Sequence, residues 1–148
     1  MPAFRFEYEP RVVDPAVTVS LSYAEVVVVS APLPVSGSLY QASKLVPPAG
    51  MLLREGGVVI VCAECPGGVG PLRTVNEGIF QLGVRRFLPE RFTLLLVSGM
   101  PEATVRETYA TFSPSLEAAL ASAQELVGKP APDVLVLPDA GDLVPRRR

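Results

Sequence analysis

Short apolar runs alternate with helix-like patterns along most of this chain. Two β-branched runs, residues 25–30 and 58–63, carry apolar side chains at nearly every position. Continuous runs of this kind are typical of strands that are buried on both faces of a parallel sheet. Residues 92–97 and 133–137 have the same character, so the pattern predicts four core strands.

Helical patterns occupy the segments between these runs. The first helix, from about Ser38, is expected to break near Val46, because the next two residues are prolines and cannot donate an amide hydrogen. A second helical piece over residues 48–54 is expected to end at the glycine pair 56–57.

Three more helices follow. After the second strand, four apolar residues spaced three or four apart predict a half-buried helix: Leu72, Val75, Ile79 and Leu82. Residues 102–107 form a short helical pattern. In the last helix Ser113 is expected to be the cap, Pro114 the first helical residue and Gly128 the stop. The alternation predicts an α/β domain of three layers, Rossmann-like, with a mainly parallel sheet and helices on both faces.

The length of 148 residues fits one ordinary domain. Residues 1–23 are expected to form an N-terminal arm, in which the period-two alternation of residues 3–9 indicates an edge strand. Residues 24–145 are expected to form the single α/β domain. The three terminal arginines, residues 146–148, are expected to be a solvated basic tail.

The composition excludes several classes of protein. A net charge of −2 provides no general attraction for nucleic acid. No apolar stretch approaches the roughly 18 residues of a membrane helix, and the N-terminus lacks a signal-peptide core, so a cytoplasmic protein is expected. Two lysines against eleven arginines, with sixteen prolines, indicate a thermophilic or GC-rich source.

The best candidate for chemistry is a polar face on the first predicted helix. Helical spacing puts Tyr40, Gln41 and Lys44 on the face opposite Leu39 and Ser43. This helix begins near the carboxyl end of a strand, where ligands bind in open α/β sheets. Lys44 and Gln41 could together bind a carboxylate or a hydroxyl group. The alternative is an ordinary solvated helix face.

A second candidate surrounds the two cysteines. Cys62 and Cys65 have the spacing of a redox motif, but they span a strand end instead of opening a helix. The chain has no histidine to complete a zinc site, so buried structural thiols are expected. Glu64, between them, could serve as a base or as a hydrogen-bond acceptor at the strand end.

A glycine-rich loop follows directly. Gly67, Gly68 and Gly70 precede a helix and could direct amides at a phosphate. Their order does not match the dinucleotide fingerprint, and no acidic residue stands at the distance needed to hold a ribose. A tight connection between strand and helix is the favoured interpretation.

Several of these pieces together resemble the C-terminal domain of the nickel-dependent lactate racemase family. The matching pieces, in order over about 45 residues, are Val28-Val29-Ser30-Ala31, Leu39-Tyr40-Gln41-Ala42-Ser43-Lys44, Gly56-Gly57, and Ala63-Glu64-Cys65 with the glycines behind it. In that family a nickel ion in a pincer-shaped nucleotide cofactor accepts a hydride from a 2-hydroxy acid. The resemblance assigns substrate or cofactor contacts to Gln41 and Lys44, with Tyr40 as their neighbour.

The chain also departs from the family. Family members have an N-terminal domain that supplies the metal-ligating histidine, both catalytic histidines and the lysine that carries the cofactor. This chain has no histidine, no tryptophan, and Ala-Pro-Leu-Pro-Val-Ser at residues 31–36 in place of a glycine pair and an aspartate. The resemblance therefore implies no catalytic residue and no metal ligand here. The nickel-pincer nucleotide is expected only where a partner completes the site.

Two hypotheses of different class follow. In the first, the chain is one subunit of a split, racemase-like isomerase, which is completed by a histidine-bearing N-terminal-half subunit. In the second, it is a non-catalytic α/β binding or scaffold module that forms a homo-oligomer. A third, an independent nucleotide enzyme, rests on the loop at residues 67–70 alone and ranks last.

Overall fold

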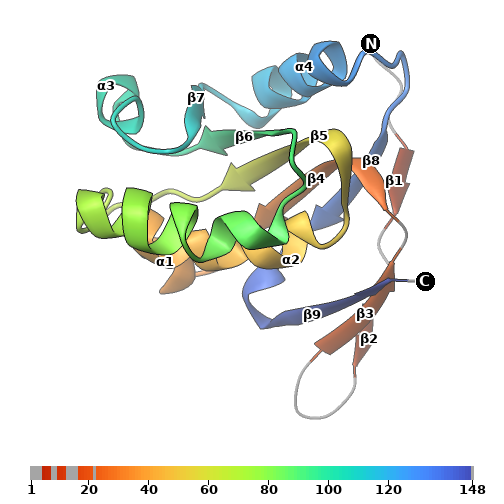
Figure 1. Ribbon diagram of the computed structural model, residues 1–148, viewed down its shortest axis with the longest axis horizontal. Coiled ribbons are helices and arrows are strands. Elements are labelled where there is room, and N and C mark those ends of the chain that lie inside the picture. Colours follow the sequence, from red (N-terminus) through yellow and green to blue (C-terminus); the bar gives the residue numbers. More distant parts are fainter. Residues whose placement is uncertain (1–4, 8–9, 13–16, 22, 148) are drawn as a thin grey trace.

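A six-stranded sheet forms the centre of the molecule (Figure 1). The computed structural model describes residues 5–7, 10–12, 17–21 and 23–147. The strand order is β1-β8-β4-β5-β6-β7, and all neighbours are parallel. The strands are β1 (Arg5–Glu7), β4 (Ala24–Ser30), β5 (Leu53–Cys62), β6 (Phe92–Val97), β7 (Thr111–Ser113) and β8 (Asp133–Leu137). All four predicted core strands are confirmed.

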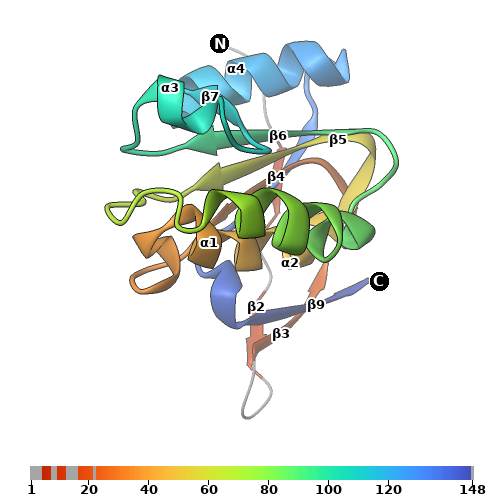
Figure 2. The same ribbon diagram turned by 60° about the vertical axis from the view of Figure 1, so that its left-hand side comes forward.

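Helices cover both faces of this sheet. In both views α4 lies on one side, and α1, α2 and the π-helix η3 lie on the other (Figures 1 and 2). The helices are α1 (Leu39–Ala42), α2 (Val46–Gly50), η3 (Thr74–Gln81), α3 (Glu102–Val105) and α4 (Leu116–Val127), with 3-10 turns η1 (Val35–Gly37), η2 (Ser43–Leu45), η4 (Val84–Phe87) and η5 (Ala140–Asp142). The predicted three-layer, Rossmann-like α/β fold is confirmed. Along the described part of the chain, no helix has the length and apolar character needed to span a bilayer.

The middle of each central strand is apolar without interruption because each face of the strand has its own core. Alternate residues of a strand point to opposite faces. Val26 and Val28 pack with Ala119 and Ala123 under α4. Val27 and Val29 belong to the larger core on the α1 side. The absence of a polar alternation in β4 is therefore a direct consequence of its central place.

The helix after β5 is wound differently from the prediction. Leu72 and Leu82 are exposed, at 38% and 80%, whereas Val75 and Phe80 are buried. The buried pair is five residues apart, which matches the i→i+5 bonding of a π-helix rather than the spacing of an α-helix. The predicted apolar stripe was wrong for its first and last members because it assumed 3.6 residues per turn.

Two helix boundaries also differ from those predicted. The break after α1 falls at residues 43–45, but α2 ends at Gly50, and the pair 56–57 lies inside β5. The chain must already be extended there because Leu53 pairs with Ala24. Ser113 does not cap the last helix, since it ends β7, and the cap is Ser115. Gly128, at φ 72°, ends α4 as predicted.

A second, three-stranded sheet pairs a segment from the first part of the chain with the last strand. In it β2 (Pro10–Val12) pairs antiparallel with β3 (Val17–Leu21), which pairs parallel with β9 (Leu143–Arg147). Arg146 and Arg147 thus belong to a strand and are not a free tail, because their backbone is paired with β3. The expected edge strand is present as β1, while residues 3, 4, 8 and 9 lie outside the described residues. The division of the chain at residues 23 and 145 stays a prediction.

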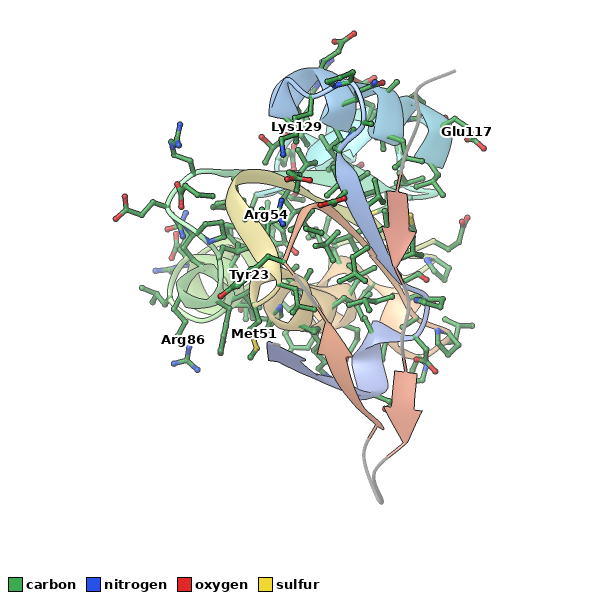
Figure 3. All side chains as sticks on the ribbon, turned by 90° about the vertical axis from the view of Figure 1, so that its right-hand side faces the viewer. Tyr23, Met51, Arg54, Arg86, Glu117 and Lys129 are labelled. Carbon is green, nitrogen blue, oxygen red and sulfur yellow. The ribbon has the colours of Figure 1, made fainter. Side chains whose placement is uncertain are left out.

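A buried carboxylate ties the amino ends of three strands together. The side chain of Glu25 in β4 is 8% exposed and pairs with Arg54 of β5 and with Lys129 Nζ at 2.8 Å. Its other oxygen accepts the N–H of Asp133, the first residue of β8, at 2.6 Å. Figure 3 looks at this end of the sheet and shows Arg54 and Lys129 near one another. The cluster compensates a charge that would otherwise be costly to bury.

Replacing Glu25 by Gln is expected to lower the free energy of unfolding by about 2 kcal/mol, because two cations lose a charged acceptor. Arg54 and Lys129 are half-exposed, which keeps the loss below that of a fully buried pair. Urea denaturation of the wild type and the variant measures this loss of unfolding free energy. Glu55→Gln is the matched control, since the half-exposed Glu55 carboxylate pairs with Arg91 and should contribute less than about 1 kcal/mol. Equal losses in the two variants would contradict this role of Glu25.

The Glu25 cluster should also make stability depend on acid pH. Burial by itself raises the pKa of Glu25, but hydrogen bonds from Lys129, from the Asp133 N–H and from Arg54 outweigh it and lower the pKa below the ordinary 4.5. A lowered folded-state pKa contributes stability that is complete above pH 4.5 and is lost as the pH falls through the folded value. The difference in unfolding free energy between wild type and Glu25→Gln should therefore shrink below pH 4.5. A difference that stays constant down to about pH 3 would exclude this linkage.

Candidate functional site

The polar face predicted on the first helix lies at the carboxyl edge of the sheet. In both views α1 lies near the end to which the arrowheads of β5 and β6 point (Figures 1 and 2). Ser38 caps α1 by accepting the Gln41 N–H on its side chain at 3.3 Å. This is the edge where open parallel sheets bind ligands, so the fold places the candidate residues where chemistry is expected.

Tyr40, Gln41 and Lys44 lie together on the outer surface of this segment. Lys44 Nζ donates to Gln41 Oε1 at 2.6 Å, and Tyr40 is 36% exposed. Leu39 and Ser43 point inward and are buried, as helical spacing predicted. With one Lys44 hydrogen used by Gln41, two ammonium hydrogens and the Gln41 amide hydrogens remain for a ligand. Such a pair suits an acceptor group, for example a carboxylate.

The glycine-rich loop turns its amides into the protein. The N–H of Gly67 donates to Gly37 O at 2.7 Å, and that of Gly68 donates to Cys65 O at 2.9 Å. The carbonyl oxygens of Gly68 and Val69 in turn accept the N–H groups of Leu39 and Tyr40, both at 3.0 Å. These two glycine amides are not available to a phosphate. The loop is a tight connection that satisfies the first turn of α1.

Glu64 lies at the same edge, beside the end of β6. Its backbone oxygen accepts the Gly99 N–H at 3.0 Å and the Ser98 hydroxyl at 3.3 Å. A Cβ added at Gly99 would come within 2.2 Å of Glu64 Oε1, so the exposed carboxylate extends along the neighbouring loop. A glycine at position 99 leaves room for it.

The two cysteines face opposite sides of the sheet. Cys65 belongs to the core on the α1 side, whereas Cys62 packs against the core under α4. Burial raises the pKa of both thiols, which disfavours the reactive thiolate. Both observations favour structural thiols over a redox pair.

A polar network around the buried Ser43 lies beneath α1 and was not predicted. The Ser43 hydroxyl donates to Leu39 O at 2.8 Å and lies 2.7 Å from the Tyr109 hydroxyl. Asn76 accepts the Tyr109 N–H and donates to Glu107 O, both at 2.9 Å. Asn76 is the only asparagine of the chain. This rarity is the one feature of the sequence that points to Asn76, and it does not reveal which residues Asn76 contacts.

The described residues do not form a metal centre. Among them no group of three or more histidine, cysteine, aspartate or glutamate side chains is placed to hold an ion, and the sequence has no histidine. The donor set at this edge, an amine with an amide and a phenol, does not fit a nickel ion. It fits an anionic organic ligand.

No protein-family model and no curated protein matches this sequence. Among solved structures, the chain is similar to the lactate racemase apoprotein from Thermoanaerobacterium thermosaccharolyticum, with a TM-score of 0.72 and 22% sequence identity. The match covers 88% of this chain and 37% of that chain. The two share a fold, and the present chain spans little more than a third of the length of that protein.

The packing of Tyr40 on the loop can be tested at two glycines. Gly68 and Gly70 both have positive φ, at 74° and 82°, but only at Gly70 would a Cβ meet another residue, at 2.9 Å from Tyr40 Cβ. Gly68→Ala should cost about 1–2 kcal/mol from the backbone conformation alone. Gly70→Ala should cost about 1–3 kcal/mol more because of the clash. Thermal denaturation of the two variants measures the difference, and equal losses would show that Tyr40 does not pack there.

Proposed function

We propose that this chain is the C-terminal-domain-like half of a lactate racemase-type protein, an isomerase of 2-hydroxy acids that is completed by a histidine-bearing partner subunit in the cytoplasm. The observation that carries the proposal is the surface of Tyr40, Gln41 and Lys44 at the carboxyl edge of the sheet. Support comes from the fold, which is similar to part of a lactate racemase chain. The chain alone has no histidine and no complete catalytic set.

The chemistry of the surface defines what it would bind. The Lys44 ammonium is a point charge that attracts a carboxylate or a phosphate. The Gln41 amide, oriented by its hydrogen bond to Lys44, can donate to a second oxygen of the same ligand. Tyr40 adds a hydroxyl and an aromatic edge. A 2-hydroxy acid has a carboxylate and a hydroxyl on neighbouring carbons, so it matches this pair of donors.

The edge also has the apolar character of a surface that docks against another protein. Leu33 is 67% exposed and Leu72 is 38% exposed. Leu72 follows Gly70, which packs against Tyr40, and Leu33 reaches towards Gly37 in the loop that precedes α1. A partner seated on this rim would remove the apolar surface from water and enclose Lys44, which strengthens its attraction to a ligand.

The cofactor of such a site would be held mainly by the partner. The nickel-pincer nucleotide supplies hydride acceptance when it is bound. Among the described residues of this chain, no group of three or more histidine, cysteine, aspartate or glutamate side chains is placed to hold the metal ion. In this proposal, Gln41 and Lys44 of this chain bind acceptor groups of the substrate or of the nucleotide. Glu64 and the Gly67–Gly70 loop lie at the border of the site.

A non-catalytic binding or scaffold module is the second candidate. It is favoured by the mutual hydrogen bond of Gln41 and Lys44, which pairs the two side chains with each other without a ligand. It is favoured also by Pro32 and Pro34, which surround the exposed Leu33 and shape the loop at this edge. In this case a second copy of the chain would cover the rim.

The proposal is tested by isolating the tagged chain from its own cells. Mass spectrometry and metal analysis are expected to identify a histidine-bearing partner and nickel, and the assembly should interconvert L- and D-lactate in a chiral assay. The Gln41→Ala, Lys44→Ala double variant should reduce this rate by about 10²- to 10⁴-fold, since it removes two hydrogen bonds to a charged group and each contributes about 1.5–3 kcal/mol.

Lys129→Ala is the matched control, because the other lysine of the chain lies at the opposite end of the sheet and should leave the rate unchanged. Recovery of the chain without nickel and without a histidine-bearing protein would overturn the split-enzyme proposal. A symmetric homo-oligomer that the double variant disrupts would establish the scaffold alternative.

A further inference from the structure

The hydroxyl groups beneath α1 have a fixed direction of donation. Ser43 is fully buried, and its single hydroxyl hydrogen goes to Leu39 O at 2.8 Å. With the Ser43 hydrogen used in this way, the contact of 2.7 Å between the two hydroxyl groups uses the hydrogen of Tyr109. Burial raises the pKa of Tyr109 to about 12, so the phenol keeps this hydrogen at any ordinary pH. Tyr109 is thus a permanent donor to the underside of α1.

Tyr109 is itself held by η3. Its ring stacks on Phe80 with centroids 4.0 Å apart and planes at 8°. Its N–H donates to Asn76 Oδ1, and Asn76 also donates to Glu107 O. Two residues of the π-helix therefore fix the ring and the backbone of Tyr109. A π-helix in this place is notable, because such segments are often found at functional sites.

The segment that carries Gln41 and Lys44 has little stability of its own. The helix α1 has four residues and continues into the 3-10 turn Ser43–Leu45, and helices this short are not stable without tertiary contacts. The apolar contacts of Leu39 and Ala42 hold it against the core. Two backbone hydrogen bonds to the glycine-rich loop hold its first turn. The hydrogen bond with Tyr109 holds Ser43, the residue next to Lys44.

From this geometry we infer that Tyr109 is a positioning residue for the Gln41–Lys44 pair, acting through Ser43 and held in place by Asn76 and Phe80. The inference rests on the proposed function, since the pair that Tyr109 positions is the proposed ligand-binding pair. Removal of the Tyr109 hydroxyl would free the turn at residues 43–45 to rotate and would change the geometry of the surface above it. If Tyr109 had only a structural role, removal of its hydroxyl group would lower the stability of the protein and leave the geometry of the Gln41–Lys44 pair unchanged.

The chain has only two lysines, Lys44 and Lys129, which permits a direct measurement on the isolated protein. With lysine labelled by 13C at Cε, two side-chain signals are expected in the NMR spectrum. Tyr109→Phe should shift the Lys44 signal by more than its line width and leave the Lys129 signal in place. Ser43→Ala should shift the Lys44 signal in the same way. The two substitutions combined should shift it no further than either alone, because both remove one shared hydrogen bond.

Ile60→Val is the control for general destabilisation. Ile60 lies in the core under α4, on the other face of the sheet, and this substitution destabilises the fold modestly without touching the network. It should leave the Lys44 signal unchanged. An unshifted Lys44 signal in Tyr109→Phe, or an equal shift in Ile60→Val, would reduce Tyr109 to a structural residue and overturn the inference.

The NMR measurement needs no partner and no ligand. It therefore tests the positioning role of Tyr109 separately from the proposed function. In the assembly described above, Tyr109→Phe should raise KM for lactate several-fold more than it lowers kcat, because it disturbs substrate binding. A shifted Lys44 signal with a lactate rate unaffected by Gln41→Ala, Lys44→Ala would overturn the proposed function and leave the positioning of the pair supported.

Discussion

The parallel pairing of β4 with β5 is the constraint on which the rest of the structure depends. Parallel neighbours cannot be joined by a tight turn, so each connection must cross a face of the sheet and cover it. The carboxyl ends of these strands then meet at one edge, together with the loops that follow them. The polar face of α1 lies at this edge because α1 is part of the first such crossover.

Backbone hydrogen bonding decides what this edge can bind. The loop at residues 67–70 uses two of its amides within the protein and presents carbonyl groups to the first turn of α1. Those carbonyl groups satisfy donors that would otherwise attract an anion. Recognition is therefore left to side chains, with Lys44 and Gln41 as donors and Glu64 as an acceptor nearby. In the proposed function these side chains, and not backbone amides, contact the ligand.

The two ends of the sheet differ in how completely their charged side chains are paired. At the amino end, Glu25 has a fully compensated charge, with two cations and one backbone N–H as partners. At the carboxyl end, Gln41 and Lys44 have hydrogens to spare and Leu33 is exposed. The fully satisfied cluster stabilises the fold, whereas the spare hydrogens of Gln41 and Lys44 are the groups that the proposed function assigns to a ligand.

The sequence by itself determined the features that depend on local spacing. Continuous β-branched runs predicted the core strands, and a period of 3.6 residues separated the inward Ser43 from the outward Gln41 and Lys44. Only the tertiary structure decided the winding of η3, the clamp around Glu25 and the link from Ser43 to Tyr109. Ser43 and Tyr109 are 66 residues apart, and Glu25 and Asp133 are 108 apart. No local pattern encodes such pairs, because a buried polar group takes whichever partner the packed crossovers bring to it.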